Sequence, residues 1–181
     1  MKRIAILIFL LNILLFASSY NEFLLKIQAK IYPKIILLDK KIDEALKDEK
    51  VRIGIVYDDG DFFTALFIKE LIIKMYNNRL NGYYFEIVPI KMLNILNKSQ
   101  NIYSYLYILK SNPDNLKMLS FYVQKNRIVT FTYDKNDLKY GFLFSINLEK
   151  RPVIYLNKKA LRRDFKFAPS LFQIVRLIDD V

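Results

Sequence analysis

The sequence has no cysteine and no histidine, and only 4 glycines among its 181 residues. Without cysteine the fold forms no disulfide, and the chain can neither carry a lipid on a thiol nor sense oxidants through one. Without histidine it lacks the side chain that best transfers protons near neutral pH and the commonest metal ligand. The spacing of Gly54, Gly60, Gly82 and Gly141 excludes the glycine patterns of phosphate-binding loops, dinucleotide-binding turns and serine-hydrolase elbows. We therefore expect a protein that is not an enzyme and that uses no cofactor and no metal.

Residues 1–19 have the three parts of a secretory signal peptide. Lys2 and Arg3 give a basic start, residues 4–16 are apolar except for Asn12, and residues 17–19 are the small residues Ala-Ser-Ser. The apolar run of 13 residues is shorter than the roughly 20 residues that a membrane-spanning helix needs. We predict cleavage after Ser19, which leaves a mature protein of residues 20–181 free in the periplasm; an uncleaved anchor is the alternative.

The chain carries a formal net charge of +11, which falls to +9 without Lys2 and Arg3. In a cytosolic protein this charge would suggest nucleic acid as a partner. Export excludes nucleic acid and leaves anionic lipid headgroups, polymers of the cell envelope or an acidic protein surface. The alternative is that the excess of lysine reflects a general compositional bias rather than a partner.

Hydrophobic periodicity divides the mature chain into alternating strands and helices. The pattern predicts strands at residues 51–57, 83–90, 102–109, 127–133, 142–148 and 152–156. It predicts helices at residues 21–32, 38–46, 61–77, from 112 onward and at 168–178. Pro33 is expected to end the first helix, and the last helix is so apolar that it should be buried. We therefore expect one α/β domain of three layers with a mostly parallel sheet, a C-terminal antiparallel hairpin and a closing buried helix.

Short motifs follow one another along the mature chain in a characteristic order. Tyr32-Pro33 closes the first predicted helix, and residues 53–59 (IGIVYDD) form a strand with an acidic exit. Residues 141–146 (GFLFSI) open the predicted hairpin, and Tyr155-Leu156-Asn157 and Ser170-Leu171 follow. In this order and spacing, and with its leader, the chain resembles the YfiR/HmsC-like periplasmic proteins. Members of that family often carry cysteines and have more glycine near the hairpin, and this chain departs from the family in both respects.

The resemblance implies a regulator that acts by protein contact. In that family the protein binds the periplasmic sensor region of an inner-membrane diguanylate cyclase and holds the cyclase inactive, so that cyclic-di-GMP and biofilm formation respond to envelope signals. The expected partner is therefore an inner-membrane sensor protein, either a diguanylate cyclase or a sensor kinase. Two alternatives stay open: a periplasmic small-molecule (solute) binding protein of a transport or sensing system, and, less favoured, a hydrolase. A homodimer also stays open.

Asp58, Asp59 and Asp61 form the densest group of carboxylates and follow the first predicted strand. Open α/β sheets usually bind ligands at the carboxyl ends of their strands, so these residues are candidate ligand-binding residues for a hard cation or an amine. The alternative is a solvated turn in which Asp61 caps the next helix by accepting its free N–H groups. The helix dipole would stabilise all three carboxylates without any ligand.

The densest basic cluster consists of Lys158, Lys159, Arg162, Arg163 and Lys166. The last four are spaced by three and four residues, which would place them on one side of a helix. They are candidate partner-binding residues for an acidic protein surface, for anionic headgroups or for an envelope polymer. The alternative is a solvated surface in a lysine-rich chain.

Tyr103, Tyr105 and Tyr107 alternate with other residues in the third predicted strand. A strand with tyrosines on one face could present a binding surface. Half-buried strands commonly have the same pattern, however, and we expect these tyrosines to pack in the core.

Overall fold

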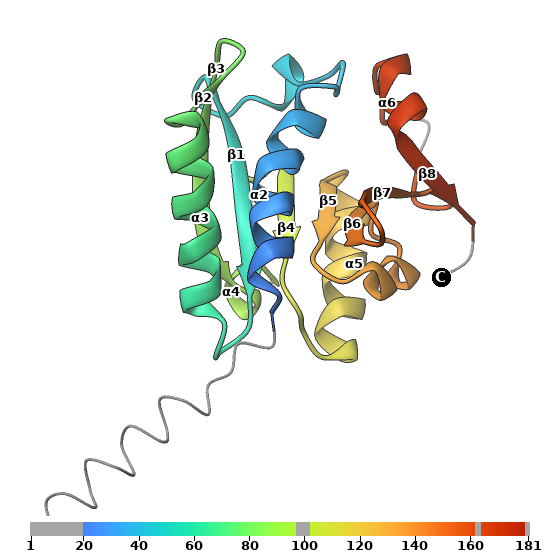
Figure 1. The fold of residues 1–181 in the computed structure, drawn as a ribbon. Coiled ribbons are helices and arrows are strands. Elements are labelled where there is room, and N and C mark those ends of the chain that lie inside the picture. Colours follow the sequence, from blue (N-terminus) through green and yellow to red (C-terminus); the bar gives the residue numbers. More distant parts are fainter. Residues whose placement is uncertain (1–19, 97–101, 162–163, 180–181) are drawn as a thin grey trace, which may run out of the picture.

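The computed structural model describes residues 20–96, 102–161 and 164–179 (Figure 1). The predicted signal peptide, residues 1–19, lies outside these ranges, as do Arg162 and Arg163. A search of the described helices finds none with both the length and the apolar character needed to cross a membrane.

The sheet consists of β1 (Lys50–Tyr57), β2 (Arg79–Leu80), β3 (Tyr83–Lys91), β4 (Tyr105–Ile108), β5 (Val129–Thr132), β6 (Phe144–Leu148), β7 (Pro152–Asn157) and β8 (Val175–Ile178). These eight strands pair in the order β2-β3-β1-β4-β5-β6-β7-β8. The strands from β3 to β6 in this order are parallel to one another, and β8 is parallel to β7. β2 is antiparallel to β3, and β6 and β7 form an antiparallel hairpin. The mostly parallel sheet and the C-terminal hairpin that the sequence predicts are thus confirmed.

Helices cover both faces of this sheet. They are α2 (Glu22–Ile36), α3 (Phe62–Tyr76), α4 (Met92–Leu96), α5 (Pro113–Asn126) and α6 (Pro169–Ile174), with short 3₁₀ helices at Asp43–Ala45 and Lys135–Tyr140. α2 and α3 lie side by side over one face (Figure 1), where their apolar side chains share a core with Ile53 and Ile55 of β1. α4 and α5 pack on the other face against Val56 and Leu106. The three-layer arrangement follows from the burial of both sheet faces.

Helix α2 continues through Pro33 to Ile36, so the prediction that Pro33 ends this helix is wrong. A proline inside a helix leaves the carbonyl four residues earlier without its donor and costs about 3 kcal/mol. The residues beyond it include Ile35 and Ile36, each only 1% exposed. Burying an isoleucine side chain contributes about 1.5–3 kcal/mol, so the two together outweigh the cost of the proline.

Residues 38–46 do not form the predicted helix; they form turns around the short 3₁₀ helix Asp43–Ala45. The Lys40 N–H donates to the carbonyl of Lys166, and the Ala168 N–H donates to the carbonyl of Leu38, both at 2.7 Å. These backbone hydrogen bonds tie the segment to a distant part of the chain. The second bond occupies the Leu38 carbonyl, which a helix over these residues would need for its own ladder, and this explains the departure from the predicted helix.

The closing segment also differs from the single buried helix that the sequence predicts. Helix α6 ends at Ile174, and the chain continues as strand β8 beside β7. Leu171 is buried, whereas Phe172, Ile174 and Leu177 are 43%, 55% and 48% exposed. A short apolar run does not distinguish a helix from a strand by its hydrophobicity alone, and here the free edge of β7 supplies partners for the backbone.

Tyr32 of α2 bridges β5 and β6 at the point where the two strands separate. The pairing of β5 with β6 ends at Thr132 and Ser145. The Tyr32 hydroxyl donates to the carbonyl of Thr132 at 2.7 Å and accepts from the N–H of Ile146 at 3.2 Å. One buried side chain thereby replaces the next step of the sheet ladder, which gives a physical role to the tyrosine of the Tyr32-Pro33 pair.

Gln28, one turn earlier in α2, continues this bridge. Its side chain is 0% exposed, and Nε2 donates to the carbonyls of Tyr133 at 3.0 Å and Ile146 at 2.8 Å. Its Oε1 accepts a hydrogen bond from the hydroxyl of Tyr107 in β4. We call Gln28 and Tyr32 the α2 clamp, because together they hold three strands of the sheet at this opening.

Candidate functional site

The sheet has a switch point between β1 and β4. The chain passes from β1 through α3 to β3 on one side of β1, and then through α4 to β4 on its other side. Ligands of open α/β sheets usually bind at the carboxyl ends of the strands that flank such a point. Here β1 is followed by Asp58, Asp59 and Asp61, and β4 is followed closely by Lys110 and Ser111. The three predicted aspartates therefore lie where a ligand site of this fold would be expected.

Asp58 and Asp59 have different partners at this end of the sheet. The Asp58 carboxylate accepts hydrogen bonds from the hydroxyl of Ser111 and, at 3.2 Å, from the side-chain amide of Asn115 in α5. The exposed Asp59 forms an ion pair with Lys91 at 2.5 Å. Asp58 thus links the ends of β1 and β4, whereas Asp59 points to the end of β3.

Asp61 does not cap α3 with its side chain, so this part of the prediction is wrong. Its Oδ2 instead accepts a hydrogen bond from the hydroxyl of the buried Tyr20 at 2.7 Å. Among the residues that the structure describes, no three acidic side chains come together as a metal site would require. The ligand-binding role of the three aspartates remains a prediction, and in the described geometry each already has a partner within the chain.

Asp137 places a further carboxylate at this end of the sheet, in the 3₁₀ helix after β5. Its Oδ2 is buried and accepts no hydrogen bond from the described residues. Burial and the negative charge of Asp134 raise the pKa of Asp137 to about 6, although Lys139 and Lys110 act in the opposite direction. The folded protein therefore binds a proton at Asp137 more readily than the unfolded chain does.

We expect Asp137→Asn to stabilise the protein at neutral pH. The folded pKa of about 6 exceeds the unfolded value of 3.8, so the wild type loses stability as pH rises from 4 through 6. After allowance for solvent screening, the variant should gain about 1–2 kcal/mol near pH 7.5 and almost nothing near pH 4. Urea unfolding at both pH values tests this, with the exposed Asp114→Asn as the control. An equal effect of Asp137→Asn at both pH values would contradict it.

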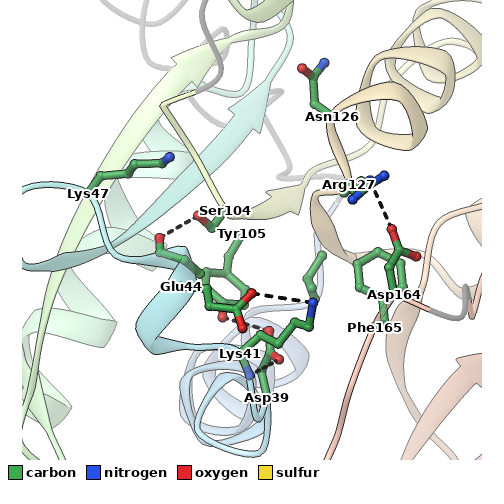
Figure 2. A pocket seen from close by; sticks show the side chains of 12 residues that line it. Asp39, Lys41, Glu44, Lys47, Ser104, Tyr105, Asn126, Arg127, Asp164 and Phe165 are labelled. Atoms are coloured by element: carbon green, nitrogen blue, oxygen red, sulfur yellow. Dashed lines mark hydrogen bonds and ion pairs between the residues drawn. The ribbon is translucent and has the colours of Figure 1, made fainter.

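A cavity of about 270 Å³ lies at the opposite end of the sheet, where β4 and β5 begin (Figure 2). It is lined by the turn segment before β1, the starts of β4 and β5, the end of α5 and the segment before α6. Its lining residues are Asp39, Lys41, Glu44, Ala45, Lys47, Ser104, Tyr105, Asn126, Arg127, Val129, Asp164 and Phe165.

Ion pairs lie on two walls of this cavity (Figure 2). Lys41 Nζ is 3.5 Å from Glu44 Oε2, and Arg127 Nε is 3.2 Å from Asp164 Oδ2. Arg127 ends α5 in the left-handed backbone conformation, with φ of 56°. The first pair lies within one turn segment, whereas the second links the end of α5 to the segment before α6.

Asp39 is the most deeply buried acid of the cavity, with 8% of the residue exposed. Its Oδ1 accepts from the N–H of Lys41 at 2.9 Å, and its Oδ2 accepts from the hydroxyl of Tyr105 at 2.9 Å. Burial is the main cause that raises the pKa of Asp39, and these two hydrogen bonds act against it. Both donors are neutral groups, and the positive charge of Lys41 also lowers the pKa of Asp39 while the negative charge of Glu44 raises it.

Tyr103, Tyr105 and Tyr107 are 3%, 0% and 2% exposed, which confirms that they pack in the core. Tyr105 additionally directs its hydroxyl to the cavity acid Asp39. Asp39 cannot be recognised as a site residue from the sequence, because the cavity is assembled from segments that are far apart in the chain. A lone aspartate in a predicted helical turn gives no signal of its own.

The basic cluster is not arranged on a helix in the residues that the structure describes. Lys159 lies in a turn and Lys166 in an irregular segment, so the predicted helical alignment is wrong for these two. Arg162 and Arg163 lie outside the described ranges. Asp164 interrupts the run of positive charge by pairing with Arg127. The partner-binding role of Lys159, Arg162, Arg163 and Lys166 remains a prediction.

Three phenylalanines are exposed on the first turns of the neighbouring helices α2 and α3; we call them the aromatic surface. Phe23, Phe62 and Phe63 are 61%, 44% and 80% exposed. The Phe62 ring lies 5.6 Å from the ring of Tyr57 and 5.7 Å from that of Phe63. A groove of about 410 Å³ between the two helices is lined by Tyr20, Glu22, Leu25, Phe63, Thr64 and Phe67. Periodicity alone does not reveal this surface, because the pattern marks apolar residues without showing which remain uncovered.

Fold and geometry define an α/β protein with a mostly parallel sheet, a polar switch point, a charged cavity and an exposed aromatic surface. No family model matches the chain, and no curated protein matches it. Among solved structures it is similar to a conserved domain protein from Vibrio cholerae, with a TM-score of 0.59 and 11% sequence identity. The match covers 84% of this chain and 59% of that chain, so the present sequence spans about three fifths of the similar structure. At this identity the similarity concerns the fold alone.

Proposed function

We propose that this chain is an exported, non-catalytic regulator that binds the periplasmic sensor region of an inner-membrane signalling protein. The favoured partner is a diguanylate cyclase. Tighter binding to the inactive state of the sensor would shift its population toward that state. The proposal is supported by the signal-peptide pattern of residues 1–19 and by the resemblance to YfiR/HmsC-like proteins.

The observation that carries the proposal is the aromatic surface. Large aromatic side chains are enriched in the buried centres of protein interfaces and among the residues that contribute most to binding. Phe23, Phe62 and Phe63 lie on two helices that pack together, so a partner would meet them on a preformed surface. In this proposal an apolar face of the sensor covers the aromatic surface. The basic cluster, whose Lys166 bonds to Lys40 beyond the other end of α2, would contact a separate acidic part of the partner.

We expect deletion of the gene to raise cyclic-di-GMP and biofilm formation, and the wild-type chain to restore both. Phe63→Asp should fail to restore them, because it places a charge in the centre of the proposed contact. Truncating a central interface residue typically costs 2 kcal/mol or more, so we expect binding to the sensor region to weaken by about thirtyfold or more. Cyclic-di-GMP content and the affinity for the purified sensor region measure the two effects.

Phe121→Asp is the matched control, because Phe121 is 76% exposed on α5, which covers the other face of the sheet. This variant should restore signalling as the wild type does. Unchanged cyclic-di-GMP after deletion would refute the proposed function. Full restoration by Phe63→Asp would refute the aromatic surface as its contact site.

A further inference from the structure

Strand β8 is the last strand of the sheet, on the side of the molecule remote from α3 (Figure 1), and no strand of the described residues pairs with its outer side. The Ile178 carbonyl accepts from the N–H of Lys158 at 2.9 Å, so the backbone groups of Ile178 face the β7 side. Backbone groups of successive strand residues alternate between the two sides, so those of Leu177 face outward. No element within the described part of the chain offers them a partner.

This outer edge also lacks the side chains that usually protect an edge strand. Such strands commonly carry lysine or proline, which discourage pairing with another chain, and β8 (VRLI) contains neither. Leu177 is 48% exposed, and Phe172 and Ile174, which precede the strand in α6, are 43% and 55% exposed. An edge with open backbone groups and exposed apolar side chains favours pairing with a further strand.

The charges at the two ends of β8 favour an antiparallel copy of the same strand as the occupant. Since β7 and β8 are parallel, the turn before β7, with the exposed Lys150 and Arg151, lies at the end where β8 begins. Asp179 follows β8 at the other end, where its Oδ1 lies 3.4 Å from Lys158 Nζ and its side chain remains 60% exposed. An antiparallel second copy would bring the acidic end of each β8 toward the basic turn of the other, whereas a parallel copy would bring like ends together.

We propose that two copies of this chain associate through β8 and form one continuous sheet across a two-fold axis. The axis passes beside Leu177, so that the two Leu177 residues exchange backbone hydrogen bonds and their side chains are in contact. A two-fold axis pairs the same surface of both copies, which is how most dimers of identical chains are built. The inference does not rest on the proposed regulatory function, because the aromatic surface lies on α2 and α3.

Sedimentation equilibrium of the protein, expressed from its full-length sequence, measures this association. Because a short edge strand supplies few contacts, we expect a reversible dimer with a Kd between about 1 and 500 μM. Leu177→Lys should weaken it at least about tenfold, since two like charges would face each other at the axis. The matched control is Leu93→Lys, because Leu93 is 50% exposed on α4, and it should leave the Kd unchanged. A protein that stays monomeric at about 0.5 mM overturns the proposal, as does a dimer that Leu177→Lys does not weaken.

Opposite charges at the same position test the two-fold arrangement. Leu177→Glu should weaken self-association as Leu177→Lys does, but an equimolar mixture of the two variants should dimerise again, because position 177 of one copy faces position 177 of the other. Recovery in the mixture also shows that both variants are folded. A mixture that stays monomeric overturns the pairing at Leu177. Phe63→Asp should dimerise as the wild type does, so a failure of this inference and a failure of the proposed function are distinguishable.

Discussion

Replacing Gln28 by leucine should lower the free energy of unfolding by about 3–5 kcal/mol, because each buried polar group left without a partner costs about 1–3 kcal/mol. Leucine has a similar size but removes the donor to the carbonyls of Tyr133 and Ile146 and the acceptor for the Tyr107 hydroxyl. These three groups lie in the buried core between α2 and the sheet, where water cannot replace the lost hydrogen bonds.

Urea unfolding measures this effect as a shift of the midpoint at constant slope. Lys34→Leu is the matched control, since Lys34 is exposed on the same helix, and it should change stability by no more than about 0.5 kcal/mol. A loss below about 1 kcal/mol for Gln28→Leu would contradict the role of the α2 clamp.

A double-mutant cycle with Tyr107→Phe separates the hydrogen bond from the general loss of packing. Tyr107→Phe removes only the hydroxyl that donates to Gln28. The two substitutions should couple by about 1–3 kcal/mol, because either one alone already removes the contact. Strictly additive effects would show that the two side chains stabilise the fold independently.

The α/β class is predictable because the alternation of strands and helices is a local pattern. Burial on both faces makes the parallel strands continuously apolar. The segments between them carry apolar residues at the spacing of a helix. The acids after β1 also mark the carboxyl end of the sheet correctly, since this follows from the direction of the strand alone. What the pattern lacks is the partner of each acid, because Lys91, Ser111 and Tyr20 come from other elements.

The departures from prediction share one physical cause, which is that tertiary contacts outweigh local preference. Pro33 stays inside α2 because Ile35 and Ile36 are buried beyond it. Residues 38–46 form turns instead of a helix because their backbone bonds to the chain around Lys166. The final apolar run forms a short helix and then a strand, because the free edge of β7 offers backbone partners to the strand. The cavity around Asp39 could not be predicted for the same reason, since only the folded chain brings its walls together.

A second large effect is expected at Gly54, in the middle of β1. A Cβ atom at this position would lie 2.7 Å from Leu106 Cδ2 and 3.3 Å from Tyr103 Cδ1. Leu106 is directly opposite in the parallel pair of β1 with β4, and it is fully buried. The glycine of the IGIVYDD motif is therefore explained by the close approach of a neighbouring side chain.

Gly54→Val should cost about 3 kcal/mol and Gly54→Ala about 1 kcal/mol, because inserted methyl groups in a packed core force side chains and backbone to shift. Urea unfolding measures both, and removing the obstacle tests the cause. In the background of Leu106→Ala, which itself costs about 2–5 kcal/mol, Gly54→Val should cost at least about 1 kcal/mol less than in the wild type. The same cost in both backgrounds would show that contact with Leu106 is not what requires glycine at this position.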